Sequence, residues 1–125
     1  MRILLDTHVY LWWLQDSPKL SNVARVRIDS ASKVYISSAS IWEATIKAGI
    51  GKLEVDVNQL VAEITNCGFD ELPILARHAA MVAQLPDIHR DPFDRILVAQ
   101  ALCEPLRLLT ADGILGGYSE LVETV

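Results

Sequence analysis

Short apolar runs alternate with longer helical stretches along most of the chain, and this alternation limits the fold more than any other feature. The first run, Arg2–Leu5, is nearly all apolar, as expected for a strand buried on both faces. The stretches between runs have the stop signals of helices, such as Gly68 and Pro86. Such an alternation is typical of an α/β domain with a parallel sheet flanked by helices. With 125 residues, the chain is expected to form one domain over 1–125.

The boundaries of the expected elements follow from apolar patterning and from capping residues. The predicted strands are Arg2–Leu5, Val34–Ile36, Phe69–Leu72 and Leu106–Leu109. The predicted helices are Val9–Leu14, Ser21–Ser32, Ser37–Ala48, Val57–Cys67, Leu75–Leu85, and one that Asp91 and Pro92 open and that runs to about Cys103. The last segment, Gly116–Val125, has no pattern that predicts an element.

Composition excludes several classes of protein. Apolar residues make up 51% of the chain and charged residues 22%, which excludes a disordered chain. No apolar run reaches the roughly 18 residues of a membrane span. Asp6 interrupts the N-terminal apolar run where a signal peptide would continue. The separated cysteines, Cys67 and Cys103, fit a reducing compartment. The sequence therefore predicts a cytoplasmic protein with no membrane partner.

Two acidic residues follow predicted strands. Asp6 comes directly after Arg2–Leu5, and Asp112 comes shortly after Leu106–Leu109. Each also has a local interpretation, Asp6 as the N-cap of the next helix and Asp112 as part of an Asp-Gly turn. Ligands of open parallel sheets bind beyond the carboxyl ends of the strands. Both acids therefore lie where a site is expected.

Two more acidic residues lie early in predicted helices. Glu43 is explained locally either by a capping box with Ser40 or by a pair with Lys47 four residues later. Asp94 lies in the first turn of a helix for which Asp91 is the expected N-cap. These helices begin at the edge where the strands end, so the acids are expected to converge on one crevice. Four carboxylates in one crevice call for a hard divalent cation, Mg²⁺ or Mn²⁺.

Four blocks of the sequence are informative in combination: Leu4–His8 with Leu11–Leu14, then Ser37–Glu43, then His89–Arg95, and finally Leu109–Asp112. In their order and spacing, over residues 2 to about 115, these blocks resemble the PIN domain family and, more narrowly, the VapC-type toxins of bacterial toxin–antitoxin pairs. The resemblance implies a single PIN-like domain with a parallel sheet of about five strands flanked by helices.

The resemblance also implies a function. A member of this family is a Mg²⁺- or Mn²⁺-dependent endoribonuclease that hydrolyses RNA phosphodiester bonds with a metal-activated water. It implies that the catalytic and metal-binding residues are Asp6, Glu43, Asp94 and Asp112. The implied partners are an RNA substrate, a cognate antitoxin protein and a second copy of the chain in a homodimer. A housekeeping nuclease of the same family is the alternative to a toxin.

Other residues of these blocks are candidates for supporting roles. Thr7, Ser38 and Thr110 occupy motif positions that in relatives support the acids by hydrogen bonding. Local capping of the backbone by each hydroxyl is an equally good interpretation. Asp91 is typical of this subgroup, and its expected main role is the cap.

Basic residues near the acids bear on RNA binding. The net charge of −5 argues at first against a nucleic-acid partner, but without the four site acids the acidic residues nearly balance the 11 basic ones. Arg90 and Arg95, which flank Asp94, are candidates for contacts with RNA phosphates, with surface solubility as the alternative. His8 and His89 are expected to be structural and not catalytic.

Functions of other classes are less well supported by the motifs. A receiver-like signalling domain needs an acidic pair before Asp6 and a lysine after the last strand, yet no lysine lies beyond Lys52. A phosphatase with an aspartyl nucleophile needs a second aspartate two residues after Asp6, where the chain has His8. A noncatalytic α/β binding module of the same fold remains an alternative that metal chelation would distinguish.

Overall fold

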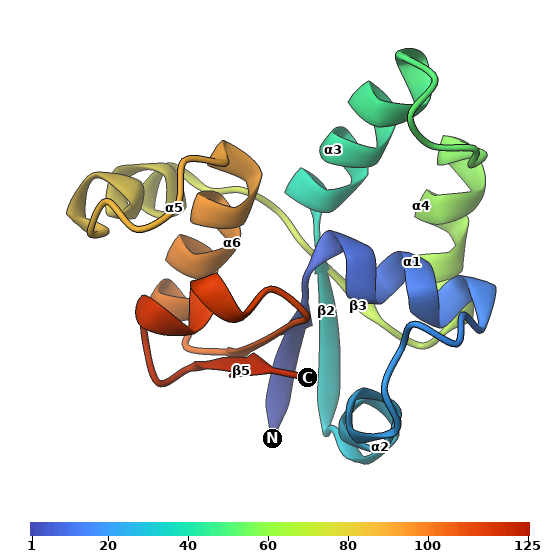
Figure 1. Cartoon of the computed structure of the whole chain (residues 1–125), viewed down its shortest axis with the longest axis horizontal. Helices are drawn as coiled ribbons and strands as arrows, with labels where there is room; N and C mark the ends of the chain where they lie inside the picture. Colours follow the sequence, from blue (N-terminus) through green and yellow to red (C-terminus); the bar gives the residue numbers. More distant parts are fainter.

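A five-stranded parallel sheet forms the centre of the protein, described here over residues 1–125 by a computed structural model (Figure 1). The strand order is β3-β2-β1-β4-β5, and every neighbouring pair is parallel. The strands are β1 (Arg2–Leu5), β2 (Lys33–Ser37), β3 (Asp70–Leu72), β4 (Arg107–Thr110) and β5 (Val122–Thr124). The expectation of an α/β domain with about five parallel strands is confirmed.

Helices connect the strands and cover both faces of the sheet (Figure 1). They are α1 (Thr7–Gln15), α2 (Asn22–Ser30), α3 (Ser38–Gly49), α4 (Val57–Asn66), α5 (Ala76–Met81) and α6 (Pro92–Cys103), with short 3₁₀ helices η1 (Val82–Gln84) and η2 (Gly113–Gly117). None of the helices combines the length and the apolar character that a membrane crossing requires.

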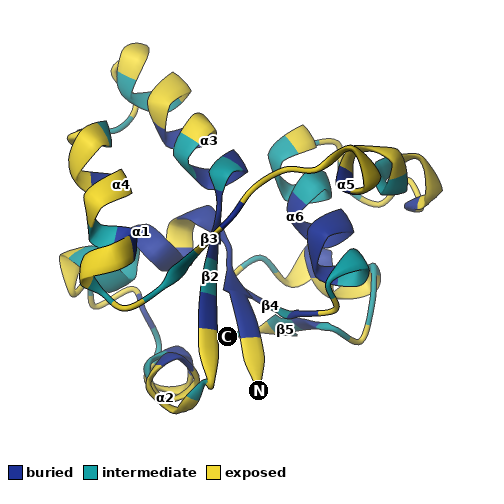
Figure 2. Cartoon of the chain, turned by 180° about the vertical axis from the view of Figure 1, so that it is seen from behind, coloured by how far each residue is buried: buried dark blue, intermediate teal, exposed yellow.

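The strand β1 is buried on both faces, as its apolar sequence predicts (Figure 2). Ile3 and Leu5 pack into a core with side chains of α1, α2 and α4. Leu4 points to the other face and packs with α6. This alternation is the period of two expected of a strand. Because β1 lies in the middle of the sheet, Asp6 lies at the centre of its carboxyl edge.

Two parts of the chain differ from the sequence prediction. The strand β5 lies in the segment that predicts no element, because only one of its three residues, Val122, is buried and the pattern is too short to recognise. The predicted helix Leu75–Leu85 is wrong in its second half. The α-helix ends at Met81 and continues as η1, where the Val82 carbonyl accepts from the Leu85 N–H at 3.2 Å and from Arg95 Nη2 at 3.2 Å.

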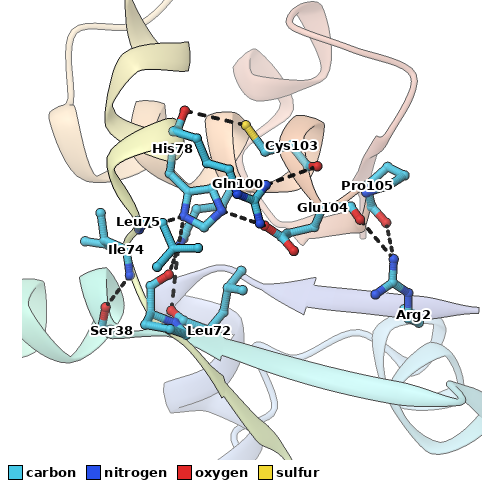
Figure 3. Close-up of polar contacts among 12 residues, drawn as sticks. Arg2, Ser38, Leu72, Ile74, Leu75, His78, Gln100, Cys103, Glu104 and Pro105 are labelled. Atoms are coloured by element: carbon cyan, nitrogen blue, oxygen red, sulfur yellow. Dashed lines mark hydrogen bonds and ion pairs between the residues drawn. The ribbon is translucent and has the colours of Figure 1, made fainter.

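A closed polar cluster fastens α5 to the end of α6 (Figure 3). The fully buried ring of His78 accepts the Leu75 N–H on Nδ1 at 3.0 Å, and its Nε2 lies 2.6 Å from Glu104 Oε2. Arg77 pairs with the same carboxylate at 2.6 Å. The hydrogen bond from His78 lowers the pKa of Glu104. This cluster fixes the far end of α6, the helix that carries Asp94 at its other end.

Candidate metal-binding site

The structure brings all four candidate acids together at the carboxyl edge of the sheet. Asp6 follows β1, Glu43 lies on α3, Asp94 lies on α6, and Asp112 follows β4. All four line one pocket of about 300 Å³. His8, Trp12, Lys47, Asp91 and Ala111 complete its lining.

Asp6 is both the N-cap of α1 and a wall of this pocket. The Val9 N–H donates to Asp6 Oδ1 at 2.8 Å, so the predicted cap is confirmed. The side chain is buried, and this desolvation raises the pKa of Asp6. The hydrogen bond with the Thr110 hydroxyl opposes the rise in pKa, and the nearby charge of Glu43 adds to it. The cap and the site are thus two roles of one carboxylate.

Glu43 is a buried carboxylate held by a single cation. The helix α3 begins at Ser38, and Ser37 is its cap, since Ser37 Oγ accepts the Ala39 N–H at 3.0 Å. The predicted capping box of Ser40 with Glu43 is therefore wrong, because Ser40 lies inside the helix. The alternative pair is confirmed, with Lys47 Nζ 2.8 Å from Glu43 Oε2. The Glu43 side chain is only 6% exposed, so this ion pair is not an ordinary solvated one.

Asp94 is a second acid of the pocket whose charged form is disfavoured. Asp91 caps α6, with its Oδ1 accepting the Phe93 N–H at 2.8 Å, as predicted. Asp94 lies in the first turn beyond this cap. Burial, and then the charges of Asp91 and Glu43, raise the pKa of Asp94 to about 7, while His89 acts against the rise. At neutral pH this carboxyl is therefore poised between its protonated and charged forms.

Thr110 links the segment that carries Asp112 to the segment that carries Asp6. The Ile114 N–H donates to Asp112 Oδ1 at 3.0 Å, so Asp112 caps η2. The Asp112 N–H donates in turn to Thr110 Oγ1 at 3.0 Å. Thr110 also hydrogen-bonds Asp6. The Thr110 hydroxyl, at the end of β4, thus contacts both Asp6 and the backbone of Asp112.

The other two hydroxyl residues act at a distance from the acids. Thr7 Oγ1 donates to Ser40 Oγ at 2.9 Å, which ties α1 to α3 in the buried interior. Ser38 accepts the Ile74 N–H at 3.2 Å and so fixes the chain between β3 and α5 (Figure 3). The expected hydrogen bond from Ser38 to the acids is replaced by this backbone contact, because its hydroxyl points out of the pocket toward α5.

Arg90 and Arg95, the two candidates for contacts with RNA phosphates, differ in how far their side chains are bonded within the protein. The Arg95 guanidinium donates to the carbonyls of Pro86 at 3.0 Å, His89 at 3.3 Å and Val82 at 3.2 Å, and to the Tyr118 hydroxyl at 3.2 Å. Both terminal nitrogens of Arg95 thus donate to groups of the protein itself, which argues against the predicted phosphate contact. Arg90 is exposed at the edge of the neighbouring groove and keeps its candidacy.

His8 and His89 are both near the acids, although the sequence interpretation set them aside as structural: His8 lines the pocket, and His89 lies beside Asp94 and Asp112. The Nε2 of His89 lies 3.6 Å from Asp94 Oδ2 and 3.4 Å from Asp112 Oδ2. One ligand atom from each of these three residues lies within 4.8 Å of the others. The position of His89 two residues before the cap Asp91 was visible in the sequence. The direction of its ring was not, because the fold of the loop decides it.

The chemistry of the donor set fits a hard divalent cation. Carboxylate oxygens dominate the lining, and the only lysine there, Lys47, already pairs with Glu43. The pKa values of Asp6 and Asp94 are raised partly because carboxylates face one another. A cation held by Asp6, Asp94 and Asp112 would offset that repulsion with the oxygen ligands that Mg²⁺ and Mn²⁺ prefer.

Comparison with known proteins agrees with this architecture. The chain is 27% identical over 116 residues to Ribonuclease VapC22 of Mycobacterium tuberculosis, covering 88% of this chain and 86% of the relative. Its fold is similar to VapBC2 from Rickettsia felis, solved bound to a DNA fragment from their promoter (TM-score 0.72, 15% identity, 100% of this chain and 99% of that one). It is also similar to a toxin–antitoxin complex from Klebsiella pneumoniae (TM-score 0.68, 16% identity, 98% and 96%). The family model of the PIN domain matches residues 3–120, and the chain belongs to the PIN domain family.

Proposed function

We propose that the protein is a Mg²⁺- or Mn²⁺-dependent endoribonuclease that hydrolyses RNA phosphodiester bonds. The observation that carries this proposal is the convergence of Asp6, Glu43, Asp94 and Asp112 on one pocket. The likeness to Ribonuclease VapC22 supports RNA as the substrate class. A bound divalent cation would neutralise phosphate charge and make water a better nucleophile at neutral pH.

The residues of the pocket divide the work according to their surroundings. Asp6 is the best-fixed candidate ligand, because the Val9 N–H and the Thr110 hydroxyl set the direction of its carboxylate. Asp94 and Asp112 complete the oxygen set from the other side of the pocket. Glu43 is held toward Lys47 and is our candidate for orienting the attacking water or for binding a second ion.

We further propose that the protein is the toxin of a VapBC-type pair and binds a cognate antitoxin. The likeness to structures described as toxin–antitoxin complexes supports this partner. A groove of about 410 Å³ between α1 and α4 is suited to receive a protein segment. Its floor is apolar, from Leu11, Leu14 and Leu60, and acidic residues edge it, so a segment with apolar and basic side chains would fit.

A second copy of the chain is the proposed partner of another surface. Trp42 and Ile46 on α3 and Ile50 at its C-cap are exposed at intervals of four residues. Ile74 and Leu75, just before α5, are exposed as well. An apolar surface of this kind is typical of an interface between proteins, and a homodimer would cover it. The free thiols of Cys67 and Cys103 fit the proposed cytoplasmic location.

Cleavage of total cellular RNA tests the proposed activity. Wild-type protein is incubated with Mg²⁺, with EDTA, and beside the variants Asp6→Asn and Asp29→Asn. Asp29 is an exposed residue of α2, remote from the pocket, so Asp29→Asn is the matched control for the same chemical change. We expect the wild type and Asp29→Asn to cut discrete RNAs, and EDTA or Asp6→Asn to abolish cutting. Cutting that persists in EDTA or in Asp6→Asn would exclude the carboxylate pocket as the catalyst.

A further inference from the structure

The backbone of His89 is clamped from both sides by the C-terminal segment. The His89 N–H donates to the Tyr118 hydroxyl at 2.7 Å, and the same hydroxyl lies 3.2 Å from the His89 carbonyl, to which it donates. Arg95 Nη1 donates to that carbonyl at 3.3 Å and to the Tyr118 hydroxyl at 3.2 Å. The loop before α6 therefore presents the His89 ring in one fixed position.

The direction of the ring fixes its tautomer. The Asp91 N–H donates to His89 Nδ1 at 3.0 Å. A ring nitrogen that accepts an N–H carries no proton, so the proton of the neutral imidazole lies on Nε2. That nitrogen faces the carboxylates of Asp94 and Asp112, at 3.6 and 3.4 Å. The Nε2–H of His89 thus faces two acids of the pocket.

The same bonds argue against His89 as a metal ligand. A histidine nitrogen binds a metal through its lone pair. The lone pair of Nδ1 is taken by the Asp91 N–H, and Nε2 carries the proton. Ligation through Nε2 would move the proton to Nδ1, where it would meet the Asp91 N–H. The spatial cluster of His89, Asp94 and Asp112 is therefore not a three-ligand site in this arrangement.

A second histidine of the chain has the same arrangement. In the closed cluster, His78 accepts the Leu75 N–H on Nδ1 at 3.0 Å and directs Nε2 to Glu104 Oε2 at 2.6 Å (Figure 3). There the ring holds one carboxylate in a fixed position. At His89 the N–H faces two carboxylates, at longer distances of 3.6 and 3.4 Å.

We propose that His89 is a positioning residue of the acidic pocket, whose Nε2–H keeps the carboxylates of Asp94 and Asp112 turned toward a shared cation. This inference rests on the proposed metal-dependent function. It predicts that His89 sets the affinity for the metal without binding it. Residues that orient metal ligands in this way typically change metal affinity by about tenfold to a hundredfold when replaced.

Two substitutions of His89 separate the role of the acceptor nitrogen Nδ1 from that of the donor nitrogen Nε2. His89→Asn retains an acceptor near the Asp91 N–H but has no donor that reaches the carboxylates. His89→Gln retains a donor near the position of Nε2. Binding of Mn²⁺ to the full chain is measured by the loss of the free-ion EPR signal, with circular dichroism and melting temperature as checks of folding. We expect His89→Asn to weaken Mn²⁺ binding by about tenfold to a hundredfold, and His89→Gln to stay near the wild-type affinity.

Three results would overturn the inference, each for a different reason. Equal Mn²⁺ affinity in the wild type and a folded His89→Asn would show that the donor is not needed. Nitrogen coupling to bound Mn²⁺ in pulsed EPR that disappears in His89→Gln would show that His89 is a ligand. No Mn²⁺ binding by the wild type would reject the metal-dependent function itself, and with it the role of His89. If His89→Asn fails to fold, the comparison of nitrogen coupling between the wild type and His89→Gln still decides between donor and ligand.

Discussion

Two polar clusters lie at opposite ends of α6, and in each a histidine accepts a backbone N–H on Nδ1 and directs Nε2 toward carboxylates. The pKa values of carboxyl groups in the two clusters are nevertheless shifted in opposite directions. At the end of the helix, Glu104 is matched by His78 and Arg77, both at 2.6 Å, and its pKa is lowered. At the start, Asp94 shares a pocket with other acids, and its pKa is raised to about 7. A buried polar group whose hydrogen bonds are satisfied, as His78 is, helps to stabilise a fold. A pocket with an excess of one charge is typical of a functional site, because a bound cation or a proton relieves the repulsion.

The largest expected effect comes from removing one carboxylate charge from the acidic pocket. We expect Asp94→Asn to lower metal-dependent RNA cleavage by at least about a hundredfold, since a proposed metal ligand is lost. The same change should raise the melting temperature in EDTA at pH 8, because like-charge repulsion falls. Cleavage assays and thermal melts on one preparation test both effects, with Asp29→Asn as the control. An Asp94→Asn variant that is inactive and also less stable than the wild type would contradict the view that repulsion between the carboxylates destabilises the fold.

Removing a carboxylate from the closed cluster should have the opposite effect on stability. Glu104→Ala leaves the buried Nε2–H of His78 without a partner, and we expect a loss of about 1–3 kcal/mol in the free energy of unfolding. Mn²⁺ affinity should be unchanged if the protein is folded. Arg77→Ala is the matched control, since Arg77 is half exposed and its pair should contribute less than about 1 kcal/mol. Equal losses in the two variants would argue against a special role of His78.

The two clusters should also respond to pH with opposite signs. The pKa of Asp94 is raised from 3.8 to about 7, so between these values the folded chain holds a proton that the unfolded chain has lost. Its contribution to stability is therefore present at low pH and is lost as pH rises through about 7. The lowered pKa of Glu104 gives a contribution that is present above its ordinary pKa and lost as pH falls.

Melting temperatures between pH 5 and pH 8 in EDTA test this difference. The wild type should lose stability toward pH 8, and Asp94→Asn should lose less. Excess Mg²⁺ should restore stability at pH 8 more than at pH 5, because the charged carboxyl is the form that binds a cation. A wild-type profile that matches that of Asp94→Asn would show that the Asp94 carboxyl does not titrate in this range.

The smallest expected effect tests the clamp on His89. Tyr118→Phe keeps the ring of Tyr118 and removes the hydroxyl that binds the His89 backbone. We expect a loss of about 1 kcal/mol in stability and a weaker Mn²⁺ affinity than the wild type, but a smaller loss than in His89→Asn. Tyr35→Phe is the control, since Tyr35 is partly exposed on β2, away from the pocket. If Tyr118→Phe binds Mn²⁺ as tightly as Tyr35→Phe does, the Tyr118 hydroxyl is not needed for metal binding.

Most of the fold and the four acids could be predicted from the sequence because the signals are local. The strand β1 is continuous and apolar, and Asp6 follows it directly, so a rule about strand ends sufficed. The cap Asp91 and the following proline fixed the start of α6 in the same way. These features depend on residues that are neighbours in the chain.

The features that escaped prediction depend on contacts between distant residues. The hydrogen bonds of Arg95 are decided by carbonyls 6 to 13 positions before it in the chain and by Tyr118. The strand β5 is too short to have a pattern and exists because β4 offers it an edge. For Ser38 the motif position left open whether its hydroxyl supports the acids or caps the backbone locally, and only the path of the chain before α5 shows that it accepts the Ile74 N–H.

The hydroxyl of Thr110, which contacts Asp6 and the Asp112 backbone, has a consequence for the synthesis of the protein. Asp6 is translated long before β4, Thr110 and Asp112. A growing chain on the ribosome therefore has no complete acidic pocket until Asp112 has been added. Translation of residues 107 to 118 supplies this remaining acid and then Tyr118, which holds the His89 backbone. The order of synthesis thus delays the assembly of the pocket until the sheet can hold all of its acids together.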